Sequence, residues 1–226
     1  AGGGVFVHFD NISGKKAEVY VDTEVHNSGK RTRTVAVETV LADAGDVPVK
    51  RISQQVKLQA GESKTVRQQF AVRNPKLWSP DSPYLYRIQS RVKAGHEVLD
   101  GGVTRVGIRK AEFKGKDGFW LNGKPFGQLV GANRHQDFAY VGNALPNSQQ
   151  WRDAKRLRDA GCTIIRVAHY PQDPAFMDAC DEMGLFVIVA TPGWQYWNKD
   201  VKFGELVHQN TREMIRRDRN HPSVLM

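Results

Sequence analysis

The chain has 226 residues, of which 40% are hydrophobic and 25% charged, and it contains five Trp, six Tyr and ten Phe. This composition is typical of globular domains and excludes a disordered chain. Two cysteines, Cys162 and Cys180, exclude a disulfide scaffold and a four-cysteine zinc site, and we expect both to be small buried hydrophobic residues. The longest apolar run, Leu185 to Ala190, is far too short to span a membrane, so no membrane partner is predicted.

The net charge of +9 is spread over both halves of the chain. The densest basic runs, at 30–33 and 216–219, contain no aromatic residues that could stack on bases. We therefore expect solvated turn and helix surfaces and no nucleic-acid partner.

The first hundred residues alternate between apolar and polar side chains. This alternation predicts strands at 19–25, 35–41, 66–72 and 84–92, separated by turn signals such as Asn27-Ser28-Gly29. About seven short strands in about 100 residues are typical of an immunoglobulin-like β-sandwich. We predict that residues 1–108 form this domain.

After Ile108 the pattern changes to a short hairpin at 119–125 and then to alternating strands and helices. Strands are predicted at 128–132, 163–168, 185–190 and from Val224, and helices at 148–160, 173–184 and 203–217. Asp173-Pro174 is a helix start signal and Gly184 a helix stop signal. The alternation favours parallel strands, and the absence of a Gly-x-Gly-x-x-Gly loop disfavours a dinucleotide-binding fold.

We therefore predict that residues 109–226 form the N-terminal half of a (β/α)8 TIM barrel. A half barrel leaves strand edges uncovered, so we expect a fragment of a longer protein or self-association into a homo-oligomer. The start, Ala1-Gly2-Gly3-Gly4, has the composition of a cut or tagged end, and no signal peptide is recognisable.

Polar segments follow three of the predicted barrel strands, at 133–137, 166–171 and 191–198. Working residues of such barrels lie at the carboxyl ends of the strands, so we expect the three segments to face one cavity. Their Arg, His and Asp side chains can bind hydroxyls, and their aromatic rings can stack on the face of a sugar. A carbohydrate is therefore the expected ligand.

Each candidate residue also has a structural interpretation. Arg166 lies within an apolar strand and must be paired, by an ion pair inside the barrel or by a ligand. His169 could cap a strand end, and His135 and Asp137 could shape their loop. Trp194 and Trp197 could fill a core or an interface.

Several motifs together resemble glycoside hydrolase family 2, the β-galactosidase and β-glucuronidase family. The similarity covers nearly the whole chain and rests on six motifs in the family's order: Leu77-Trp78-Ser79-Pro80-Asp81-Ser82-Pro83-Tyr84-Leu85-Tyr86, Phe119-Trp120-Leu121-Asn122-Gly123-Lys124-Pro125, Gly131-Ala132-Asn133-Arg134-His135-Gln136-Asp137, Ile165-Arg166-Val167-Ala168-His169-Tyr170-Pro171, Asp181-Glu182-Met183-Gly184-Leu185 and Arg217-Asp218-Arg219-Asn220-His221-Pro222-Ser223-Val224.

The resemblance implies a retaining exo-glycosidase of carbohydrate catabolism, most similar to β-galactosidases, that hydrolyses terminal β-linked sugars. In this mechanism one carboxylic acid protonates the leaving oxygen, and a second carboxylate about 5 Å away forms the glycosyl-enzyme intermediate. The family motifs place both carboxylates beyond Met226, so no catalytic residue is expected in this chain, and the fragment itself is expected to be inactive. The resemblance assigns substrate binding to His135, Asp137, Arg166 and His169, and we add Trp194 because its ring can stack on a sugar. It implies no cofactor and no metal.

The chain departs from the family at three positions. Ala168 stands where Ser is usual, Thr163 where Asn is usual, and Ala190 where an acidic residue is common. Loss of that acid leaves the sugar open and is compatible with an alternative function, a non-catalytic carbohydrate-binding or scaffold module. A second alternative is a metal-dependent hydrolase that uses His135, Asp137 and His169. Enzymes that degrade polysaccharides are often exported, so a periplasmic or secreted location is expected.

Overall fold

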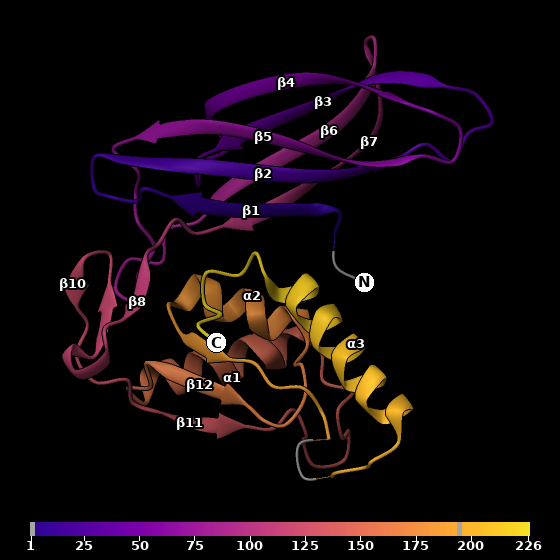
Figure 1. Ribbon diagram of the computed structural model, residues 1–226. Helices are drawn as coiled ribbons and strands as arrows, with labels where there is room; N and C mark the ends of the chain where they lie inside the picture. The colour runs from indigo at the N-terminus through magenta and orange to yellow at the C-terminus, as the bar shows by residue number, and fades with distance from the viewer. Residues whose placement is uncertain (1–2, 194–195) are drawn as a thin grey trace. The chain divides into compact units, whose positions relative to one another are not determined.

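The computed structural model describes residues 3–193 and 196–226, and it separates into two compact units (Figure 1). The sandwich unit comprises Gly3–Leu77 and Tyr84–Arg109, and the barrel unit comprises Trp78–Pro83 and Lys110–Met226. Each unit is described by itself.

Two antiparallel sheets form the sandwich unit and confirm the predicted immunoglobulin-like class. One sheet has the order β1-β2-β5 and the other the order β4-β3-β6-β7. The strands are β1 Val5–Asp10, β2 Lys16–His26, β3 Arg33–Ala42, β4 Pro48–Leu58, β5 Ser63–Arg73, β6 Tyr86–Ala94 and β7 Glu97–Val106.

Alternation along these strands builds the sandwich core. Every second residue of β2, including Val19 and Val21, is completely buried, as the period-2 pattern requires. The core also contains one polar tie between strands of the two sheets. Thr39 on β3 donates to Gln68 Oε1 on β5 at 2.6 Å, and Gln68 Nε2 donates to the carbonyl of Val37 at 3.0 Å. Satisfied buried polar groups of this kind fix how two sheets match.

The barrel unit begins with a small antiparallel sheet, β10-β9-β8, and continues as a parallel sheet, β11-β12-β13. Its elements are β8 Ala111–Phe113, the 3₁₀ turn Gly115–Asp117, β9 Phe119–Leu121, β10 Lys124–Pro125, β11 Gly131–Arg134, α1 Asn147–Asp159, β12 Ile164–Val167, α2 Pro174–Met183, β13 Phe186–Ile188 and α3 Val201–Asp218. The order of strands and helices confirms the predicted partial TIM barrel.

Helices α1 and α2 lie on the same side of the parallel sheet (Figure 1). The cluster between them and the sheet includes Ala154, Ile165, Phe176 and Cys180, all completely buried. Cys180 is thus a buried hydrophobic residue as predicted, and burial raises the pKa of its thiol well above the ordinary value. Cys162 is partly buried against the same cluster.

Helix α2 begins and ends at the predicted signals. The Asp173 carboxylate accepts a hydrogen bond from the Ala175 amide at 2.8 Å, Pro174 is the first helical residue, and Gly184 ends the helix in the left-handed conformation at φ = 71°. The predicted strand at 128–132 was placed too early, because β11 begins at Gly131. At Val130 the amide donates to the Thr163 hydroxyl instead of to a backbone carbonyl, so regular pairing starts one residue later.

The apolar stripe predicted for the third helix is only half covered. Phe203 and Val207 are partly buried, but Leu206 is 48% exposed. None of the helices in the described part of the chain combines the length and apolar composition that crossing a membrane requires.

Candidate substrate pocket

The candidate site is the carboxyl edge of β11 and β12, where His135 and His169 follow the two strands. Their ring centroids lie 5.3 Å apart and the ring planes meet at 77°. Tyr170 packs edge-on against His135 at 6.1 Å. Two residues far apart in the sequence therefore meet at one point, as parallel strands with matched registers require.

Gln136 ties the two loops together. Its backbone amide donates to the Tyr170 hydroxyl at 3.0 Å, and its side-chain oxygen accepts the Asp173 amide at 2.6 Å. The loop after β11 is thereby fixed to the loop that leads into α2. The sequence prediction did not single out Gln136 or Tyr170, although both stand inside the motifs that it quoted.

Arg166 lies on β12, level with Asn133 of β11 and Ile188 of β13. Its neighbours Ile165 and Val167 are completely buried against the helices, so Arg166 points to the opposite face of the sheet. Within residues 3–193 and 196–226 it has no hydrogen bond or ion pair with another described residue, and the predicted structural ion pair is therefore not seen among them.

The positive charge of Arg166 acts on His169. Desolvation lowers the pKa of His169 first, and repulsion from Arg166 and then His135 lowers it further. A neutral imidazole can donate from one ring nitrogen and accept at the other. This is the state that suits hydrogen bonds to sugar hydroxyls.

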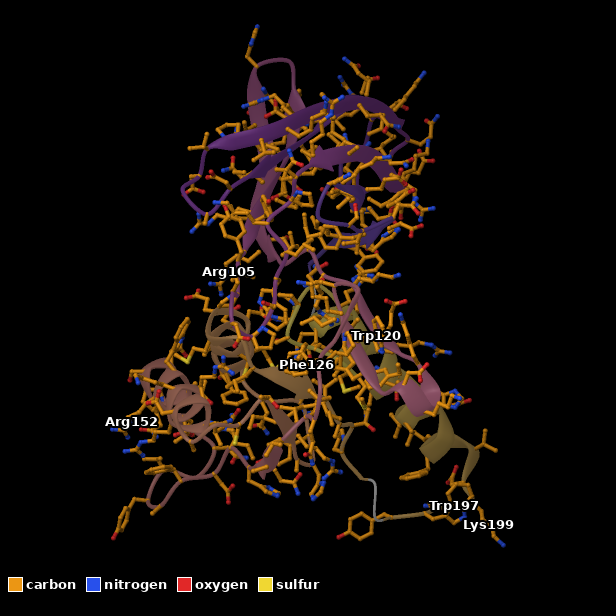
Figure 2. All side chains as sticks on the ribbon, turned by 90° about the vertical axis from the view of Figure 1, so that its left-hand side faces the viewer. Arg105, Trp120, Phe126, Arg152, Trp197 and Lys199 are labelled. Atoms are coloured by element: carbon orange, nitrogen blue, oxygen red, sulfur yellow. The ribbon has the colours of Figure 1, made fainter. Side chains whose placement is uncertain are left out.

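The other predicted site residues are not brought to this point. Asp137 is exposed in the loop after β11, and no hydrogen bond to it is seen from any other described residue. Trp194 lies outside the described residues. Trp197 is 83% exposed and projects from its loop together with Lys199, which disfavours a core role (Figure 2).

The third polar segment has a hollow of its own. A cavity of about 520 Å³ is lined by residues from the loop after β13 and from α3, among them Thr191, Trp197, Phe203 and His208. His135 and His169 are not among the described residues that line it. The expectation of one shared cavity is thus met only for the first two segments in the part of the chain that the structure describes.

Arg134 was missed as a structural residue of the motif. It is 6% exposed, and its Nη2 donates to Gln150 Oε1 at 2.7 Å and to Asp153 Oδ2 at 2.8 Å. Its Nη1 donates to Gln172, and its guanidinium lies 4.0 Å from the ring centre of Phe176. Arg134 therefore anchors β11 to both helices on the side of the sheet opposite Arg166.

A group of metal-ligand type lies elsewhere in the described residues. Ligand atoms of Asp178, Asp181 and His221 all lie within 4.8 Å of one another. Both carboxylate oxygens of Asp181 are already engaged, one at 2.6 Å from His221 Nδ1 and one at 3.0 Å from the Ser223 amide. This is a hydrogen-bonded pair and not an open ligand set. The alternative trio of His135, Asp137 and His169 forms no such group within the described chain.

Comparison with known proteins adds the family context. The family model "Glycosyl hydrolases family 2" matches residues 4–109, and "Glycosyl hydrolases family 2, TIM barrel domain" matches residues 112–226. A β-galactosidase of Thermoanaerobacter pseudethanolicus is 36% identical over 98% of the chain, and β-galactosidase BoGH2A of Bacteroides ovatus is 32% identical over all of it. The chain spans only 29% and 27% of the lengths of these two relatives.

Solved structures give the same picture. A β-glucuronidase of Bacteroides uniformis superimposes with a TM-score of 0.93 at 30% identity, covering 98% of this chain and 27% of that one. A family 2 glycosyl hydrolase of Bacteroides cellulosilyticus superimposes with a TM-score of 0.91 at 34% identity, covering 99% of this chain and 29% of that one.

Proposed function

This chain belongs to the glycosyl hydrolases of family 2, and from that premise we propose that the full-length protein is a retaining exo-glycosidase that removes terminal β-linked sugars. The observation that carries the proposal is the pair of His135 and His169, 5.3 Å apart at the carboxyl edge of two parallel strands. Residues 1–108 serve as the immunoglobulin-like domain and residues 109–226 as the first half of the catalytic barrel.

In this proposal the pocket residues hold the sugar and do not transfer the reacting proton. His135 and neutral His169 exchange hydrogen bonds with sugar hydroxyls, Arg166 supplies a charged donor from the inner face of β12, and Asp137 contacts a hydroxyl. Trp194 supplies a stacking surface. The acid and the nucleophile, placed beyond Met226 by the family resemblance, perform the two displacements. Residues 1–226 alone therefore have no hydrolytic activity.

A β-galactoside is the proposed substrate class. Several relatives that cover nearly all of this chain or most of it are named β-galactosidases, at 36%, 43% and 32% identity. A relative of Formosa agariphila named putative β-glucuronidase is 34% identical, so the sugar must be decided by assay.

The test compares full-length protein on nitrophenyl β-galactoside and nitrophenyl β-glucuronide. We expect faster hydrolysis of the galactoside, with retention of the anomeric configuration in the first-formed product by NMR. His135→Ala and His169→Ala should each lower kcat/KM about tenfold, the effect of losing one hydrogen bond of about 1.4 kcal/mol. His96→Ala, at an exposed turn of the sandwich unit, is the matched control and should stay within about twofold of wild type.

The second candidate function is a non-catalytic carbohydrate-binding module. Ala190 favours it, because the family commonly has an acid there. Saccharide binding by calorimetry without hydrolysis of either glycoside would support this candidate and reject the glycosidase.

A further inference from the structure

Asp181 is a buried acid that the proposed pocket does not use. It lies on α2, is 1% exposed, and joins three parts of the barrel unit. Its side chain binds His221 Nδ1 at 2.6 Å and the Ser223 amide at 3.0 Å, and its backbone carbonyl accepts the indole N–H of Trp78 at 2.8 Å. One residue thus connects α2 with the segments before and after it in the chain.

The segment that Asp181 holds is the start of the fourth barrel strand. Val187 of β13 donates to the Ser223 carbonyl at 2.8 Å and accepts from the Leu225 amide at 2.9 Å. The Met226 carbonyl accepts the Val189 amide at 2.9 Å, and Val187 and Val224 form a parallel bridge. Figure 1 shows the C-terminus beside α2. The side-chain bonds of Asp181 therefore stand immediately before the backbone pairing that adds this strand to the sheet.

We propose that Asp181 is a positioning residue: through His221 and Ser223 it fixes the register of the fourth barrel strand and so the place of the acid that follows that strand. The inference rests on the proposed function, because the family resemblance puts the acid/base glutamate a few residues after Met226. A helix contributes the anchor because a short strand with one paired neighbour has few backbone bonds to hold its register.

The surroundings of His221 strengthen the pair. Burial lowers the pKa of His221, but the hydrogen bond to Asp181 and the charges of Asp181, Asp218 and Asp178 outweigh it, so the pKa is raised. Arg217 is bound to both oxygens of Asp218, at 2.6 and 2.8 Å, and partly offsets that charge.

The direction of this shift sets a pH dependence. Because the folded-state pKa is above the ordinary value of 6.5, the contribution of the charged pair is complete below that pH and is lost as pH rises through the folded pKa.

The first test measures amide hydrogen exchange in the full-length protein, which does not depend on activity. Asp181→Ala should speed exchange in the peptide that contains Leu225 at least tenfold and leave peptides from β11 and β12 unchanged. Asp181→Asn keeps an oxygen for the Ser223 amide and should have a smaller effect, so it covers the case in which the alanine variant does not fold. Asp159→Asn, an exposed acid paired with Lys155, is the control and should match wild type.

His221→Asn retains a donor near the position of Nδ1 without a titrating ring. In wild type, exchange at Leu225 corrected for intrinsic rate should rise as pH passes through the folded pKa of His221, whereas His221→Asn should show no such rise. Equal exchange at Leu225 in wild type, Asp181→Ala and Asp181→Asn would overturn the inference.

The second test separates positioning from simple stabilisation. On the glycoside that wild type hydrolyses, Asp181→Ala should lower kcat about tenfold or more and change KM less than threefold, because the His135 and His169 loops are not part of this network. His221→Asn should restore kcat relative to His221→Ala. A lower melting temperature with unchanged kcat would reduce Asp181 to a stabilising residue and overturn the inference. If wild type hydrolyses neither glycoside, the proposed function fails, while the exchange experiment still decides whether Asp181 fixes the strand.

Discussion

Arg134 and Arg166 carry the same side chain on neighbouring strands of one sheet, and they face opposite sides of it. Arg134, on β11, is level with buried Val167, and Arg166, on β12, is level with Asn133. Arg134 is bound by two glutamines and a carboxylate and covered by an aromatic ring, whereas Arg166 is half-buried with no ion pair among the described residues. The helix side of the sheet thus satisfies its cation internally, and the inner side presents one to a ligand.

The largest expected effect is the loss of the satisfied cation. Arg134→Ala leaves Asp153 and two glutamines half-buried or buried without their donor, and we expect it to lower the free energy of unfolding by about 3–5 kcal/mol. Urea unfolding of the chain followed by circular dichroism measures the change. Arg156→Ala, at an exposed position of α1, is the control, with an expected change within about 0.5 kcal/mol. Equal losses in both variants would contradict the structural role of Arg134.

The next effect tests the other end of the helix layer, at Gly184. Its φ of 71° disfavours a side chain, and an added Cβ would collide with the carbonyl of Pro80. Gly184→Ala should therefore cost about 1–3 kcal/mol by the same unfolding assay. Gly161 follows α1 with φ = 87° and open space around it, so Gly161→Ala shows the backbone strain alone. A cost at Gly184 no larger than that at Gly161 would mean that the contact with Pro80 contributes nothing.

Local signals made part of this organisation predictable. Strand alternation, the Asp173-Pro174 start and the Gly184 stop depend on neighbours in the sequence, and the structure confirms them. The role of Arg134 depends on partners at 150, 153 and 172, on three different segments, and no local pattern indicates which of two adjacent charged motif residues faces the helices.

The site was predictable to the same limit. Motif positions were enough to bring His135 and His169 to one edge, because parallel pairing follows from the strand order. They were not enough for the link through Gln136, because amide and hydroxyl hydrogen bonds between loops follow from tertiary packing. The sequence also gave no sign that Asp181, His221 and Ser223 would be joined, since 40 residues separate the acid from the histidine.

A smaller effect is expected at the helix start. Asp173→Ala removes the acceptor of the Ala175 amide and should cost about 1 kcal/mol. Asp173→Asn keeps an oxygen at this position and should stay within a few tenths of a kcal/mol of wild type by the same assay. A full loss in the asparagine variant would show that charge, and not capping, makes Asp173 stabilising.

The smallest effect on stability is expected at Arg166, and it sharpens the comparison with Arg134. Since no described ion pair is broken, Arg166→Ala should change the free energy of unfolding by less than about 0.5 kcal/mol. It should nevertheless raise the pKa of His169, because repulsion from Arg166 is one of the causes that lower it. Titration of the histidine rings by NMR, with His169→Gln used to assign the resonance, measures the shift.

The lowered pKa of His169 also fixes a sign for the wild-type chain. The folded state binds fewer protons at this ring than the unfolded state, so stability falls as pH decreases below the ordinary value of 6.5 toward the folded pKa. This slope should become shallower in Arg166→Ala. An unchanged His169 titration, or a loss of stability as large as that of Arg134→Ala, would show that Arg166 is a structural cation like Arg134, and the inner face of the sheet would then lose its proposed charged donor.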